Sequence, residues 1–193
     1  METGDYVQIK DQYFADNPNL KEFLINKEEK RLYIGLIVKL PNDLNACIPF
    51  RSNKPNNDRV VARATFAIPS NTRPNACLDL TKSLIINDEA YFKVLDKRQV
   101  KIPDTQKRHI DENIKQIHKM FDKYLDMYKK SVQKDRTSKD PLFKYSTLQN
   151  YHKELGLQKD YSVETKQEQV NNADRDMKRE RYLAYLQHQG RER

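Results

Sequence analysis

The hydrophobic positions divide the chain into two parts of different character. Up to about residue 95, short apolar runs rich in Val, Ile, Phe and Tyr alternate with clusters of Asn, Asp, Pro and Ser, a pattern typical of strands and turns. The run from Ile34 to Val38 is apolar on both faces, which predicts a central strand covered on both sides. Short connections predict antiparallel neighbours. The expected strands are 32–40, 45–50, 60–68, 77–80, 83–86 and, as a strand or a short helix, 91–95.

The pattern changes to a helical period after Pro103. Asp104 or Thr105 can cap the first turn of a long helix from about Thr105 to Lys130. We expect this helix to lie across the sheet with its apolar stripe in the core. The stripe advances by four, three, four, four and three residues through Ile110, Ile114, Ile117, Phe121, Leu125 and Tyr128.

The apolar content falls after Lys130. Residues 131–145 have no clear period and contain a candidate linker, residues 146–155 predict a short helix ended by Gly156, and 164–187 predict a polar helix. The sequence therefore predicts an α+β core over 1–130, with an antiparallel sheet and one long helix. A polar, helical C-terminal extension over 131–193 is expected to follow it.

The charge is concentrated in the strand region. The chain has 36 Lys and Arg against 28 Asp and Glu, a net charge of +8. Residues 27–73 alone carry nine basic and four acidic side chains, many of them beside turns. Basic loops on a sheet with nearby aromatic residues are typical of nucleic-acid binders, and a basic protein without such a partner is the alternative.

Several classes of protein are excluded by composition. Two cysteines are too few for a disulfide scaffold or a cysteine-rich zinc site, and a reducing cytoplasm is the expected compartment. The sequence shows no membrane-spanning run, no secretory signal and no Gly-rich phosphate loop. No helical histidine pair, carboxylate cluster or Ser-His-Asp arrangement is recognisable, so neither a metal nor another cofactor is expected.

Residues 48–55, Ile-Pro-Phe-Arg-Ser-Asn-Lys-Pro, are the most informative segment. A strand ends at Phe50, and a polar loop then places a Ser52 hydroxyl between two cations, Arg51 and Lys54. Such a set fits a phosphodiester, because the cations contact phosphate oxygens and the hydroxyl donates to another oxygen. An RNA substrate supplies its own nucleophile, the 2′-hydroxyl. A hairpin loop with surface charges is the simpler interpretation.

Three motifs occur in order along the chain: Lys-Arg-Leu-Tyr-Ile-Gly at 30–35, the loop segment at 48–54, and Leu-Asp-Leu-Thr-Lys at 78–82, followed by the long helix. In this order and spacing they resemble the toxins of type III toxin–antitoxin systems, the ToxN/AbiQ/TenpN endoribonucleases. The loop is most similar to the TenpN branch. The resemblance covers about residues 5–130.

The resemblance implies a compact, twisted antiparallel sheet with flanking helices, similar to that of the Kid/MazF toxins, and an enzyme that cleaves RNA without metal. The expected products carry 2′,3′-cyclic phosphate and 5′-hydroxyl ends. It also implies inhibition by a small repeated pseudoknot RNA, which the toxin processes and binds in a closed protein–RNA assembly, and a role against bacteriophage.

The family pattern maps onto Arg31, Ser52 and Lys54, and Arg51 completes the predicted catalytic set. Family members often carry Thr or Ser at the position of Arg51, and a His later in their loop is replaced by Asn57, which puts the roles of both side chains in question. The predicted RNA-contacting residues are Lys30, Tyr33, Phe50, Asn53, Asn57, Arg59, Arg63 and Lys82.

Two other classes of function are compatible with the sequence. One is a non-catalytic RNA- or DNA-binding module whose basic loops hold phosphates. The other is a protein–protein adaptor that acts through the polar C-terminal helix.

Overall fold

The computed structural model of the chain describes residues 1–24, 33–41 and 43–157. The strands are β1 (Tyr6–Ile9), β2 (Tyr33–Lys39), β3 (Asn45–Arg51), β4 (Thr65–Ala67), β5 (Cys77–Asp79), β6 (Leu84–Ile86) and β7 (Phe92–Leu95). The α-helices are α1 (Asp11–Asp16), α2 (Asp58–Ala64), α3 (Asp104–Glu112) and α4 (Ile114–Gln133), and the short 3₁₀ helices are η2 (Leu80–Lys82), η3 (Glu89–Tyr91) and η4 (Thr147–Asn150).

The seven strands form one sheet in which every pairing is antiparallel. Its order is β4-β5-β3-β2-β1-β7, and β6 also pairs with β3. β3 is the central strand, because its first half pairs with β6 and its last two residues, Phe50 and Arg51, pair with β5. Both β2 and β3 are buried over most of their length, as their apolar composition predicts. The predicted α+β class with an antiparallel sheet is confirmed.

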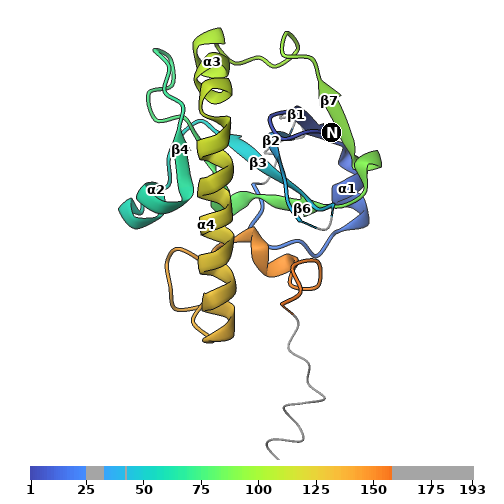
Figure 1. The fold of residues 1–193 in the computed structure, drawn as a ribbon, viewed down its shortest axis with the longest axis vertical. Helices are drawn as coiled ribbons and strands as arrows, with labels where there is room; N and C mark the ends of the chain where they lie inside the picture. The colour runs from blue at the N-terminus through green and yellow to red at the C-terminus, as the bar shows by residue number, and fades with distance from the viewer. Residues whose placement is uncertain (25–32, 42, 158–193) are drawn as a thin grey trace, which may run out of the picture. The chain divides into compact units, whose positions relative to one another are not determined.

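Helix α4 covers one face of this sheet (Figure 1). Its predicted apolar stripe is in the core: Ile117 and Phe121 are fully buried, and Leu125 and Tyr128 are nearly so. The predicted single helix is wrong in one respect, because it is broken at Asn113 into α3 and α4. The Asn113 side chain donates to the backbone carbonyl of His109, 2.8 Å away, a local bond that competes with continuous helix.

The strand predicted for residues 60–68 is wrong for its first half. Residues 58–64 form α2, and only Thr65–Ala67 are extended. The Asn57 Oδ1 accepts from the backbone N–H of Val60 at 3.1 Å, which caps the helix. Val60 and Ala64, four residues apart, are then buried together on one side of the helix.

Residues 134–157 pack against the rest of the described chain. Leu142, Phe143, Leu148, Tyr151 and Leu155 are buried in the same core cluster as the sheet. The compact unit therefore extends from Met1 to Leu157, past the boundary expected at Lys130, which lies inside α4. None of the helices in the described ranges combines the length and apolar character that crossing a bilayer requires.

Candidate functional site

The start of β2 and the end of β3 lie at the same edge of the sheet. The two strands are antiparallel, with Gly35 opposite Pro49. Tyr33 precedes Gly35 by two residues and Arg51 follows Pro49 by two, so both lie at that edge. Arg51 is also paired with Cys77 at the start of β5. The predicted residues Lys30 and Arg31 directly precede β2 but fall outside the described residues.

Arg51 is held by a buried carboxylate. Its Nη1 lies 2.7 Å from Oδ2 of Asp79, which is fully buried, while the Arg51 side chain is 32% exposed. The other Asp79 oxygen accepts from the Thr81 backbone N–H at 3.0 Å and from the Thr81 hydroxyl at 2.6 Å. A guanidinium has five N–H donors, so this pairing fixes Arg51 and uses only part of its donor capacity.

The pairing also changes the electrostatics expected for the loop. Asp79 compensates the charge of Arg51, so the loop does not present two full cations side by side. Lys54 is exposed and keeps its ammonium in the solvent, Asn53 is also exposed, and Ser52 is half-buried. The β3 ladder fixes the near end of the loop, and the Asn57 cap of α2 fixes its far end.

The thiol beside Arg51 does not provide a nucleophile. Burial, reinforced by the charge of Asp79, raises the pKa of Cys77 to about 12. Its reactive form, the thiolate, is therefore scarce at neutral pH. Cys47 on β3 is fully buried, and burial raises its pKa as well. Neither thiol is therefore suited to act as a nucleophile at this edge.

The predicted aromatic residues take part in the core as well as bordering the site. The ring of Phe50 stacks on that of Tyr6, with centroids 6.0 Å apart and planes 14° apart. The Tyr33 hydroxyl donates to the carbonyl of Lys82 at 3.0 Å, and its ring centroid lies 5.5 Å from that of Phe14. Both Phe50 and Tyr33 remain half-buried rather than enclosed.

Lys82 connects the site to the segment after α4. Its Nζ donates to the carbonyl of Tyr145 at 2.7 Å and lies 3.3 Å from the Glu22 carboxylate. The Thr147 hydroxyl donates to the backbone carbonyl of Thr81 at 3.1 Å and also bonds that of Ser83. Residues 145–147 are thus attached directly to η2, which carries the Thr81 partner of Asp79.

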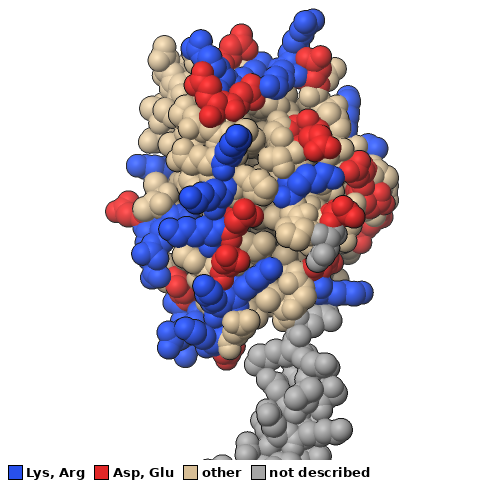
Figure 2. Space-filling view, in the orientation of Figure 1, with Lys and Arg blue, Asp and Glu red and all other residues tan. Residues whose placement is uncertain are grey.

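Arg59 and Arg63, which the sequence predicts to contact RNA, belong to α2, the helix that follows the loop in the sequence. Both are exposed. Arg59 pairs with Asp140 at 3.1 Å, and Arg63 lies in the last turn of α2. Figure 2 shows Lys and Arg side chains gathering on the left and lower left of the molecule, where α2 packs against α4. Exposed basic residues of α2, of α4 from Lys119 onward and of the segment up to residue 139 are Arg59, Arg63, Lys119, Lys123, Lys130, Lys134, Arg136 and Lys139.

The sequence motifs contain one residue of the site whose role was not predicted. Asp79 belongs to the Leu-Asp-Leu-Thr-Lys motif but is not among the predicted site residues. The sequence feature that indicates a role for it is a single carboxylate between two leucines in a predicted strand. A carboxylate that is fully buried needs a partner for its charge. Within the described ranges, no group of three or more His, Cys, Asp or Glu side chains is arranged to hold a metal ion.

Comparisons with known proteins support the fold. No family model matches the sequence, and no curated protein matches it. One similar solved structure concerns a bacterial antiviral system regulated by a processed non-coding RNA. It is 14% identical with a TM-score of 0.51, over 79% of this chain and 98% of that chain.

Another similar solved structure concerns bacterial type III toxin–antitoxin systems and selective toxin inhibition by a non-coding RNA pseudoknot. It is 16% identical with a TM-score of 0.49, over 64% of this chain and 78% of that chain. The first likeness shows that this chain has the fold of a protein from an RNA-regulated antiviral system.

Proposed function

We propose that this chain is a sequence-specific, metal-independent endoribonuclease toxin of a type III toxin–antitoxin system. The observation that carries the proposal is the fixed loop at the end of β3, where buried Asp79 orients Arg51 immediately before Ser52 and Lys54. The fold shared with a protein of an RNA-regulated antiviral system supports it. The loop residues 49–53 favour the TenpN branch of the family.

The reaction is a transesterification in which the RNA supplies the nucleophile. The ribose 2′-oxygen bonds to the adjacent phosphorus as its proton leaves to a base, and the bond from phosphorus to the 5′-oxygen breaks. That oxygen takes up a proton, giving a 2′,3′-cyclic phosphate and a 5′-hydroxyl. The protein aligns the atoms and stabilises the charge that develops on the phosphate.

Each loop residue has a distinct role in this mechanism. Lys54 supplies the exposed positive charge, and Ser52 donates to a phosphate oxygen or to the leaving oxygen. Arg51, fixed by Asp79, contributes directional N–H donors and less net charge than a lone arginine. We assign Arg31, two residues before β2 in the sequence, as a further cation for the phosphate.

The proposed inhibitor binds next to the same loop. We propose that a repeated pseudoknot RNA binds the exposed basic residues of α2, α4 and the following segment. Bound there, in a closed protein–RNA assembly, it blocks the loop. Phosphate contacts from the arginines and lysines would make this binding strongly salt-dependent. The proposed biological role is cytoplasmic RNA cleavage during bacteriophage infection.

The test is the rate of RNA cleavage by loop variants. Ser52→Ala and Lys54→Ala should each lower the rate by about 10²–10³, the usual effect of removing one preorganised donor. Lys93→Ala is the matched control, because Lys93 is exposed on β7 at the other end of the sheet. Urea denaturation should give the same unfolding free energy for all four proteins. Wild-type cleavage rates in both loop variants would refute the proposal.

A further inference from the structure

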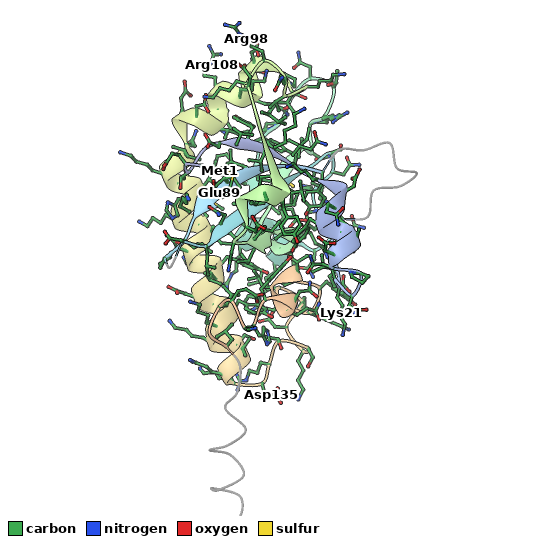
Figure 3. The ribbon with its side chains drawn as sticks, turned by 90° about the vertical axis from the view of Figure 1, so that its right-hand side faces the viewer. Met1, Lys21, Glu89, Arg98, Arg108 and Asp135 are labelled. Carbon is green, nitrogen blue, oxygen red and sulfur yellow. The ribbon has the colours of Figure 1, made fainter. Side chains whose placement is uncertain are left out.

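A concave feature lies next to the segment that η2 contacts. A cavity of about 810 Å³ is bordered by Tyr128 of α4, residues between Thr137 and His152, and the pair Lys21 and Glu22. Figure 3 shows Lys21 at the lower part of the molecule, on the side away from α4. Lys82 joins the cavity to the site, since its Nζ donates to the carbonyl of Tyr145, a cavity-lining residue. The volume is within the range of small-ligand sites.

The cavity presents an aromatic ring on a fixed backbone. Tyr145 is 54% exposed, although its neighbours Phe143 and Ser146 are buried. The Ser146 hydroxyl accepts from that of Tyr124 at 2.8 Å, and Thr147 is bonded to η2. Since large exposed aromatic rings on a rigid backbone provide stacking surfaces, Tyr145 is suited to contact a flat ligand.

Charged and neutral polar groups share the cavity lining with this ring, and the carboxylate among them, that of Glu22, lies 3.3 Å from the Lys82 Nζ. The Lys144 Nζ lies 5.2 Å from the Tyr145 ring centroid, and Lys21 also lines the cavity. His152 Nε2 is 2.8 Å from the Tyr128 hydroxyl, and burial lowers the pKa of His152, which favours a neutral imidazole. The Gln149 amide donates one N–H to the Ser146 carbonyl at 3.0 Å, which leaves its other N–H and its carbonyl oxygen for a ligand. The combination matches a base, which is flat and polar at its edge, linked to an anionic phosphate.

We propose that this cavity binds one unpaired nucleotide of an RNA strand, with its base stacked on Tyr145 and its phosphate near Lys144 and Lys21. The inference rests on the proposed function, because it places that nucleotide in the same strand as the phosphate cleaved at the Ser52 loop. The contact of Lys82 with Tyr145 supports this continuity. Gln149 and His152 are positioned to discriminate between base edges, which gives the enzyme a source of sequence preference.

Stacking is tested with the wild-type full-length chain and uncleavable RNA. The probe is a 2′-O-methyl octaribonucleotide carrying a single 2-aminopurine, whose fluorescence falls when the base stacks. Binding should quench it with wild type and with Tyr145→Phe, which keeps the ring. Tyr145→Ala should remove the quenching and weaken binding by about tenfold. Lys93→Ala is the surface control.

The outcomes separate this inference from the proposed function. If wild type cleaves RNA but Tyr145→Ala quenches and binds the probe as wild type does, the nucleotide site is refuted and the ribonuclease stands. If wild type fails to cleave RNA while Tyr145-dependent quenching persists, the site stands and the catalytic proposal fails. Loss of quenching in Tyr145→Phe as well would also refute the site, because the hydroxyl and not the stacking surface would then be needed.

Discussion

Asp79 organises the site although it is not exposed to a substrate. Its two oxygens bind Arg51 and Thr81, so one fully buried carboxylate fixes a cation of the loop and the first turn of η2. Because a buried charge is tolerated only when its hydrogen-bonding capacity is met, these partners are required by Asp79 itself. The position of Arg51 is therefore set by stability as much as by any contact with RNA.

Replacing Asp79 should affect stability and activity together. Asp79→Ala leaves Arg51 without its partner and removes the bonds to Thr81, so we expect the unfolding free energy to fall by about 3 kcal/mol, the lower end for a broken buried pair. The lower end applies because Arg51 is partly exposed. Urea denaturation gives the stability, and RNA cleavage should decrease as well.

The double variant Arg51→Met/Asp79→Leu is the control for this prediction. It replaces both charges with apolar groups, which often restores stability. Recovered stability without recovered cleavage would fit the proposed role of Arg51. If Asp79→Ala alone unfolded at the wild-type urea concentration, the structural role of Asp79 would be contradicted.

The sequence singles out candidate loop residues but does not specify their interactions. Ser52 and Lys54 could be singled out because hydroxyl and ammonium groups after a strand suggest phosphate chemistry. The compensation of Arg51 by Asp79 could not be predicted, since the two residues are 28 positions apart and meet only because β5 pairs with the end of β3. Long-range pairing depends on topology, which local patterns do not specify.

At the level of elements, α2 determines how the loop ends. The apolar run from Val60 to Ile68 reads as a strand because β-branched and aromatic residues favour extended backbone. The Asn57 cap and the burial of Val60 with Ala64 favour a helix for the first half. Tertiary contacts with α4 then outweigh the local preference, so the boundary between α2 and β4 was missed.

Asn57 is expected to contribute to stability through this cap. Asn57→Ala should lower the unfolding free energy by about 1 kcal/mol, whereas Asn57→Asp should keep it, because a carboxylate also accepts from the helix N–H groups. Asn56→Ala, at the exposed neighbouring position, is the control. Urea denaturation of the three variants is the measurement, and equal stability of Asn57→Ala and wild type would contradict the capping role.

At the scale of the whole molecule, the segment after α4 belongs to the core. Its low apolar content made residues 131–157 look like the start of a polar extension. Five of its apolar residues are nevertheless buried, and Ser146 and Thr147 bond to α4 and η2. A segment with few apolar residues can still belong to the core when each of them packs against a surface that other elements form. Sequence periodicity does not reveal such packing.

Two truncations test this extent of the core. A chain ending at Leu157 should unfold cooperatively, as the full chain does. A chain ending at Lys130 loses five buried apolar side chains, each contributing about 1.5–3 kcal/mol, and their combined contribution is comparable to a typical stability of about 5–15 kcal/mol. We expect the shorter chain to be unfolded by circular dichroism. A cooperatively folded 1–130 chain would contradict the account.

The most direct test of the central claim is the chemistry of the RNA ends left by the purified chain in the presence of EDTA. We expect cleavage to continue, leaving 2′,3′-cyclic phosphate on one fragment and a 5′-hydroxyl on the other, and we expect Ser52→Ala to slow it by about 10²–10³. Intact RNA under all conditions, or cleavage that stops with EDTA and leaves 5′-phosphate ends, would contradict the assignment of a metal-independent ribonuclease.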